Sequence, residues 1–188
     1  MPTNGTSGRR TRRAPELALT VQYGTASARL PSRARLRRWA QAALGRRAAV
    51  TLRIIGGREA RGLNRRFRGR DYATNVLSFA YPGCRPLAGD IAICAPVTAR
   101  EARARGISRA AHYAHLLIHG MLHLQGYDHG NAREARRMER LESRILAKLG
   151  YADPYLSEER GQRRKRGERS SRASRLAPLA SGSPQHGR

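Results

Sequence analysis

The sequence predicts an α+β domain in which a single four-stranded sheet packs against helices. Short segments with strand-like apolar patterns lie in the first half of the chain, and longer segments with helical periodicity dominate the second half. A chain of 188 residues is long enough for one hydrophobic core. We therefore expect one domain over residues 17–156, with a flexible basic arm at 1–16 and a disordered basic tail at 157–188.

Four segments have the alternation or the continuous apolar run that is typical of strands. They are residues 17–23, 50–55, 75–81 and 90–97. The last segment is apolar almost throughout, which predicts a central position in the sheet. A turn-rich stretch at 82–86 connects it to the strand before it.

The predicted helices are residues 31–44, 58–66, 97–105, 108–125 and 131–149. Ser108 is a suitable N-cap for the fourth of them, and Gly150 ends the fifth. The helix at 108–125 is apolar on most sides, so we expect it to be buried against the sheet. Buried imidazoles are costly unless something binds them, so its histidines need a partner.

Three histidines at the end of this helix have the spacing of a metal site. His119 and His123 are four residues apart, so they lie about 40° apart around a helix axis and can share one ion. Gly126 favours a reversal of the chain after the helix, which would bring His129 back to the same ion. Three nitrogen ligands leave a fourth tetrahedral position for water, which is the pattern of a catalytic zinc.

The spacing equals that of the long zincin motif, but Gly120 stands where that motif has its general-base glutamate. Without this carboxylate, ordinary zincin proteolysis is improbable, whereas the metal site is retained. His112 and His115 lie on the same helix, and His115 with His119 forms an alternative pair four residues apart. Neither is followed by a residue of its own that could come back to the same ion from the loop after the helix. We therefore expect both to support the ligands from outside or to line the mouth of the site.

The net charge of +25, from 38 basic and 13 acidic residues, predicts a polyanionic partner, and nucleic acid is the usual one. A GC-rich genome could explain why arginine replaces lysine, but not why acidic residues are scarce. With two Phe, one Trp and seven Tyr, base stacking should add little to RNA affinity. Two cysteines, Cys84 and Cys94, are expected to be reduced thiols. The chain shows neither a transmembrane span nor a signal peptide, so we expect a cytoplasmic protein that does not contact a membrane.

Taken together, these residues resemble the YbeY family of bacterial rRNA maturation factors, which are metal-dependent endoribonucleases. The resemblance covers most of residues 50–155. Its segments are 63–64, 67–71, 74–79, 89–91, 115–129, 138–142, 149–150 and 153–155. Departures are mild: Phe67 replaces the usual tyrosine, and the loop at 82–88 carries a cysteine. The basic tails lie outside the resemblance.

The resemblance implies one zinc ion per chain on His119, His123 and His129, no small organic cofactor, and a catalytic role for Arg68. Arginine suits phosphodiester hydrolysis because it can clamp the non-bridging oxygens as they gain charge. The family also implies a single-strand endoribonuclease in ribosome biogenesis, notably in 16S rRNA 3′-end maturation. Its partners would be single-stranded rRNA and the small ribosomal subunit with its assembly factors.

Two other hypotheses stay open at this point. The protein could be a non-catalytic rRNA or ribosome assembly factor with a structural zinc, or a metal hydrolase of another substrate. The second would need a carboxylate such as Asp128, which could orient an imidazole, accept a proton or simply form a turn. Asn75 and Ser78 are candidates for the cleft wall, although sheet contacts are the simpler role. Glu139 and Glu142 are expected to pair with arginines of the last helix.

Overall fold

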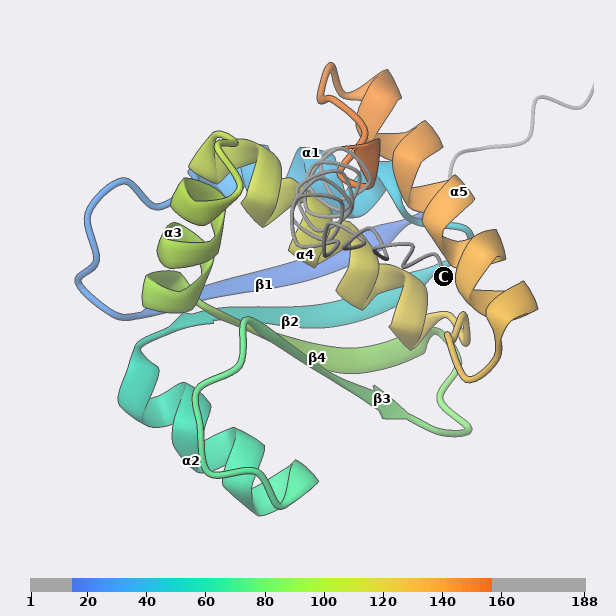
Figure 1. The fold of residues 1–188 in the computed structure, drawn as a ribbon. Coiled ribbons are helices and arrows are strands. Elements are labelled where there is room, and N and C mark those ends of the chain that lie inside the picture. The colour runs from blue at the N-terminus through green and yellow to red at the C-terminus, as the bar shows by residue number, and fades with distance from the viewer. Residues whose placement is uncertain (1–14, 157–188) are drawn as a thin grey trace, which may run out of the picture. The chain divides into compact units, whose positions relative to one another are not determined.

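The computed structural model describes residues 15–156, of which residues 15–152 belong to one compact unit. Its elements follow the order β1, α1, β2, α2, β3, β4, α3, α4, α5 (Figure 1). The predicted α+β class, with one four-stranded sheet and helices packed on it, is confirmed. The tail predicted at 157–188 and all but the last two residues of the arm predicted at 1–16 lie outside the described residues, so the predicted domain boundaries stay predictions.

The sheet contains β1 (Leu17–Gly24), β2 (Ala48–Ile55), β3 (Val76–Tyr81) and β4 (Leu87–Cys94). Their order across the sheet is β1-β2-β4-β3, so β4 is central, as its apolar sequence predicted. β1 pairs parallel to β2, and β2 pairs parallel to β4. β3 pairs antiparallel to β4 and forms the edge next to the functional site.

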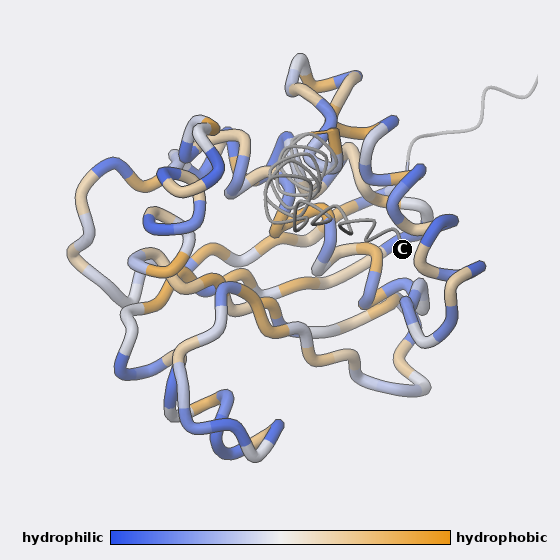
Figure 2. The backbone as a smooth tube through the Cα atoms, in the orientation of Figure 1, coloured by the Kyte–Doolittle hydropathy of each residue, from blue (hydrophilic) through white to orange (hydrophobic). Residues whose placement is uncertain are grey.

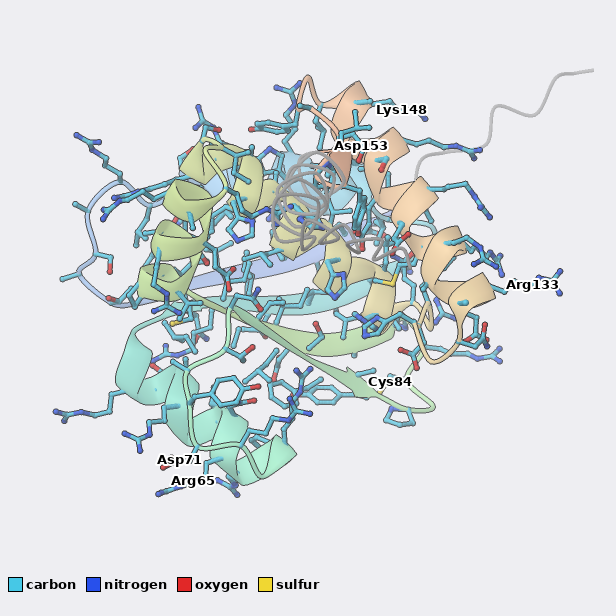
Figure 3. The ribbon with its side chains drawn as sticks, in the orientation of Figure 1. Arg65, Asp71, Cys84, Arg133, Lys148 and Asp153 are labelled. Carbon is cyan, nitrogen blue, oxygen red and sulfur yellow. The ribbon has the colours of Figure 1, made fainter. Side chains whose placement is uncertain are left out.

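The helices are α1 (Arg33–Ala42), α2 (Gly57–Arg68), α3 (Ala95–Ala104), α4 (Arg109–Leu124) and α5 (Ala132–Lys148). α2 covers one face of the sheet, and the other four helices lie on the opposite side (Figure 1). Strand residues and α4 are largely apolar, whereas α2 and α5 are mostly hydrophilic (Figure 2). On α5, Arg133 and Lys148 point away from the domain (Figure 3).

Several predicted boundaries differ from the observed ones, and two of the differences have a clear local cause. The strand predicted at 90–97 ends at Cys94, because Pro96 occupies the first turn of α3, where its fixed φ suits a helix and its missing N–H is not needed. The helix predicted at 58–66 continues to Arg68, because the chain leaves it only at Gly69, which has a φ of 67°. Arg68 therefore lies on the last turn of α2.

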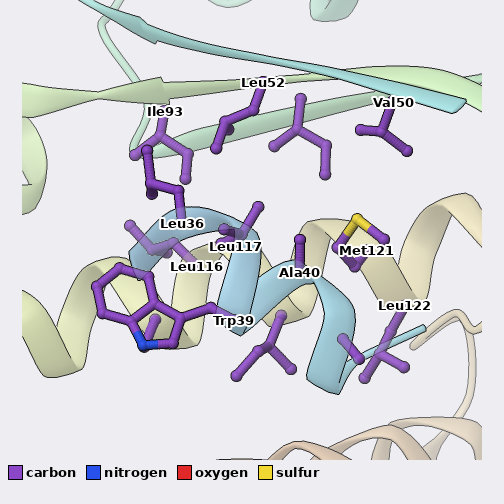
Figure 4. Close-up of a cluster of buried hydrophobic side chains, with 14 of the residues drawn as sticks. Leu36, Trp39, Ala40, Val50, Leu52, Ile93, Leu116, Leu117, Met121 and Leu122 are labelled. Carbon is purple, nitrogen blue, oxygen red and sulfur yellow. The ribbon is translucent and has the colours of Figure 1, made fainter. Parts of the chain in front are cut away.

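The main core fills the space between the sheet and the helices α1, α4 and α5. Figure 4 shows side chains of α1 and α4, among them Trp39 and Leu117, packed towards Leu52 and Ile93 of the sheet. A smaller core lies between the other face of the sheet and α2. The expected burial of the histidine-bearing helix is confirmed, since its apolar side chains are almost fully buried.

Gly120 allows α4 to lie directly against β3 and β4. A Cβ atom at this position would stand 3.0 Å from Ser78 Oγ and 3.1 Å from two side-chain carbons of Ile91. These distances are tighter than ordinary van der Waals contact, so a side chain here would require Ser78 and Ile91 to shift. The position that carries the glutamate in zincins is therefore closely packed against the sheet in this fold.

Candidate metal centre

The structure brings the three predicted histidines together. One ring nitrogen from each of His119, His123 and His129 lies within 4.8 Å of the others. The Nε2 atoms of His119 and His123 are 3.1 Å apart. Two imidazole nitrogens on a tetrahedral zinc, each about 2.0–2.1 Å from it, would stand about 3.3 Å apart. The helical pair therefore already has nearly the separation that such an ion requires.

His129 reaches the other two because α4 ends in a tight reversal. The Tyr127 N–H donates to the Leu122 carbonyl (3.1 Å), and the Gly126 N–H donates to the His123 carbonyl (2.9 Å). This is a Schellman arrangement, which requires the positive φ of 87° found at Gly126. The prediction that Gly126 turns the chain back towards the helix is confirmed.

The bend after α4 is fixed at both ends. The Gln125 side chain donates to the Ala43 and Met121 carbonyls, each at 2.8 Å, and accepts from the Gly45 N–H at 2.7 Å. On the other side, the Asn131 side chain caps α5 by accepting from two backbone N–H groups. These contacts restrain the segment that carries His129, so the third ligand has a defined position.

Glu142 of α5 orients the first ligand. Its side chain is fully buried, and it accepts from His119 Nδ1 at 2.8 Å and from His115 Nε2 at 3.1 Å. Once the His119 proton is on Nδ1, the Nε2 lone pair is free for a metal. Burial alone raises the pKa of Glu142, but the hydrogen bonds from the two histidines outweigh burial and lower this pKa to about 2.

The prediction that Glu142 pairs with arginines was therefore wrong. Its helix turns this residue inward beside Met138, Ile145 and Leu146, where it meets His119 and His115. A carboxylate on the apolar face of an amphipathic helix is a signal that sequence reasoning could have used.

The second ligand is held in its neutral form. Burial, together with the neighbouring His119 and His129, lowers the pKa of His123 to about 4. At neutral pH its imidazole therefore keeps the lone pair that a metal ligand must offer.

The two remaining histidines of α4 lie outside the ligand set. His115 shares Glu142 with His119, and its ring lies edge-on to the His119 ring with centroids 6.3 Å apart, which agrees with the supporting role expected for it. His112 is 2% exposed and its Nε2 lies 2.7 Å from Glu101, a residue that sequence reasoning missed. The same Glu101 oxygen accepts from Asn75 Nδ2 at 3.0 Å. His112 thus contacts the cavity wall through Glu101 and does not line the mouth of the site.

A cavity of about 470 Å³ opens beside the histidines. Its lining comprises the three histidines with Arg68, Asn75, Val76, Ser78, Ala80, Leu124 and Asp128. Arg68 therefore faces the same space as the ligand group, although it comes from α2 on the other side of the sheet. Asn75 and Ser78 do line the cleft.

Asp128 does not orient an imidazole in this arrangement. Its Oδ1 lies 4.0 Å from the Nδ1 atoms of His123 and His129, which is too far for a hydrogen bond. The same oxygen accepts from the His129 backbone N–H at 2.8 Å, so Asp128 is a turn residue at the rim of the cavity. Among residues 15–156, the group with ligand spacing contains the three histidines alone, which leaves room for a non-protein ligand.

Comparison with known proteins decides the family. The family described as Endoribonuclease YbeY matches residues 27–150. The chain belongs to the YbeY family. Endoribonuclease YbeY of Aromatoleum aromaticum is 55% identical over 142 residues, which cover 74% of this chain and 92% of that protein. The Bordetella avium protein of the same name is 57% identical over 155 residues, which cover 76% of this chain and 95% of that protein.

Membership of the YbeY family confirms the resemblance seen in the sequence, and with it the predicted enzyme class, a metal-dependent endoribonuclease. The predicted three-histidine metal site is present as well. Between residues 15 and 156, no helix has the length and apolarity needed to cross a bilayer.

Proposed function

We propose that His119, His123 and His129 bind one zinc ion per chain. Imidazole nitrogen suits zinc, and a set of three leaves a position for water in a tetrahedral geometry. Zinc, when bound, supplies a water molecule whose pKa is near 7 and polarises a phosphoryl oxygen. Support comes from the neutral state of His123 and from Glu142, which holds the Nδ1 proton of His119 and so directs Nε2 to the ion.

We propose that Arg68 is the catalytic arginine. The observation that carries this proposal is that Arg68 and the three histidines line one cavity of about 470 Å³. A phosphodiester placed between them would meet the guanidinium on one side and the ligand group on the other. Arg68 would donate to the non-bridging oxygens, whose negative charge grows during hydrolysis. The pocket wall from β3 would supply the Ser78 hydroxyl as a further donor.

The substrate we propose is single-stranded rRNA, cut during 16S rRNA 3′-end maturation in the cytoplasm. The net charge of +25 supports a polyanion, and the partners would be the small ribosomal subunit and its assembly factors. Contacts to phosphates would dominate binding, so affinity should fall steeply as salt increases.

Three variants test this function. His123→Ala should lose both bound metal and RNA cleavage, whereas Arg68→Ala should keep the metal and lose about 100-fold in cleavage rate. Arg65→Ala is the matched control, because Arg65 is an exposed arginine of the same helix that does not line the cavity (Figure 3). Metal content and cleavage of a defined RNA are measured on nuclease-free preparations. Cleavage by His123→Ala, or equal rates for the two arginine variants, would refute the proposal.

A further inference from the structure

A second hollow lies on the face of the sheet that is opposite the main core. Its volume is about 540 Å³, and it opens between α2 and the strands. Leu63, Phe79 and Ala92 are among the side chains that line it and belong to the smaller core. Phe67 from α2 and Tyr81 from β3 line it as well. We call this hollow the aromatic groove.

Two of the three aromatic rings that line this groove are largely exposed. Phe67 is 54% exposed and Tyr81 is 46% exposed. The Phe67 ring packs against Phe79, with a centroid separation of 4.8 Å, and the Tyr81 hydroxyl donates to Asp90. These contacts hold the rings in defined orientations while a large part of each remains in water. Exposed apolar surface of this kind is typical of binding sites.

The groove and the metal cavity are lined by the same two elements, β3 and α2. Along β3, Ser78 and Ala80 line the metal cavity, whereas Phe79 and Tyr81 line the groove, because successive side chains of a strand point to opposite faces. β3 is an edge strand of the sheet, so no further strand separates the two hollows on its outer side.

At the end of α2, two adjacent residues line different hollows. Phe67 lines the aromatic groove, and Arg68 lines the metal cavity. The Arg66 guanidinium lies over the Phe67 ring, with its central carbon 5.4 Å from the centroid. A cation and an aromatic face thus stand next to the residue proposed to hold the phosphate.

We propose that the aromatic groove binds a nucleobase of the RNA substrate, from a nucleotide adjacent to the cleaved phosphodiester. The RNA chain would cross the free edge of β3. Its phosphate would lie at Arg68, and the base would lie on the other face of the sheet. Phe67 and Tyr81 are the stacking residues, and stacking is tolerant of base identity because every base has a π face. The inference rests on the endoribonuclease activity of the family.

The chemistry of the groove matches a base better than an aliphatic ligand. Its floor is apolar, but its rim carries Arg53, which is hydrogen-bonded to Glu59 at 2.7 Å, and Asp90, which is held by Tyr81. A base presents donors and acceptors at its edge and an apolar face above and below the ring. The small number of aromatic residues predicted that stacking contributes little to RNA affinity. The position of Phe67 and Tyr81 close to Arg68 nevertheless favours the stacking of one base beside the cleaved phosphate.

The test combines protein variants with modified RNA. The probe is a single-stranded RNA oligonucleotide with one mapped cut, together with versions that carry an abasic residue at each position flanking that cut. Phe67→Ala and Tyr81→Ala should raise KM by about 5- to 100-fold, the range expected for the loss of one stacked base. Metal content should not change. Phe67→Trp, which keeps a stacking surface, should bind as the wild type does.

Tyr72→Ala is the matched control, because Tyr72 is an aromatic residue of the same segment, 52% exposed, that does not line the groove. Its KM should equal that of the wild type. One abasic position should weaken wild-type binding by the same factor as Phe67→Ala, and should weaken Phe67→Ala no further.

Equal KM values for Phe67→Ala and Tyr72→Ala would overturn the inference and leave the endoribonuclease function intact. An abasic scan with no weak position in the wild type would do the same. Absence of cleavage by the wild type itself would instead overturn the proposed function, and the inference with it.

Discussion

Replacing Glu142 with glutamine removes the charge of a carboxylate that serves two histidines at once. Glutamine has the same shape, but it offers one acceptor oxygen where the carboxylate offers two. His119 Nδ1 and His115 Nε2 both lie within hydrogen-bonding distance of Glu142, so one of them must face an N–H₂ group in the variant. If that residue is His119, its proton moves to Nε2 and blocks the atom that binds the metal.

The size of the effect follows from the environment of Glu142. The side chain is fully buried, and its pKa is about 2, compared with 4.5 for an unperturbed glutamate. This difference corresponds to up to about 3 kcal/mol of stabilisation in the metal-free protein at neutral pH. Because the folded-state pKa is depressed, the stabilisation is complete above about pH 4.5 and is lost as the pH falls towards 2. Loss of a carboxylate that orients a ligand should also weaken metal binding by about 10- to 100-fold.

Competition with a chromophoric zinc chelator measures the affinity, and urea unfolding in the presence of excess chelator measures the stability. Glu139→Gln is the control, because Glu139 is an exposed glutamate of the same helix, three residues before Glu142. We expect the control to match the wild type in both measurements. A Glu142→Gln protein that binds zinc within threefold of the wild type would show that the carboxylate does not orient the ligand.

Three further predictions concern pH and two glycines. In the metal-free protein, the free energy of unfolding should fall as the pH drops from 6.5 to about 4, because the unfolded chain protonates His123 before the folded chain does. Urea titrations should show a shallower fall for His123→Gln. An unchanged slope in this variant would contradict the assignment to His123. Gly120→Glu should destabilise the fold by at least about 1–3 kcal/mol without creating peptidase activity, since the new side chain meets β3 and β4. Thermal unfolding measures the stability and a casein assay measures the peptidase activity. A stable, proteolytic variant would refute the prediction. Gly126→Ala should cost about 1 kcal/mol at a φ of 87° and weaken metal binding through His129; unchanged stability and affinity would show that the bend tolerates a side chain.

The ligand set was predictable because its geometry is local. Two histidines one helical turn apart and a glycine before the third define the site within eleven residues. The spacing of a helix and the φ preference of glycine are properties of short segments, so the sequence carries them directly. The strands and helices were predictable for the same reason, although several of their bounds were not; Pro96 and Gly69 set the ends of β4 and α2.

The residues that support the ligands were not predictable in this way. Glu142 lies 23 residues from His119 and Glu101 lies 26 residues from Asn75, and each pair meets only because two elements pack together. Sequence reasoning assigned Glu142 to a solvated partner because most glutamates on an arginine-rich helix have one. Which face of α5 turns towards α4 is decided by burial of Met138, Ile145 and Leu146.

The fold class, the convergence of the three imidazoles, the family and the strong positive charge all follow from the sequence alone. All of these depend on residue types and on spacing along one short stretch of chain. Three arrangements are visible only in the folded protein: Arg68 of α2 lines the metal cavity, Glu142 holds the proton of His119, and Phe67 and Tyr81 face a second hollow. These arrangements join residues distant in the chain, and they arise from the alternation of side chains across a sheet with helices on both faces.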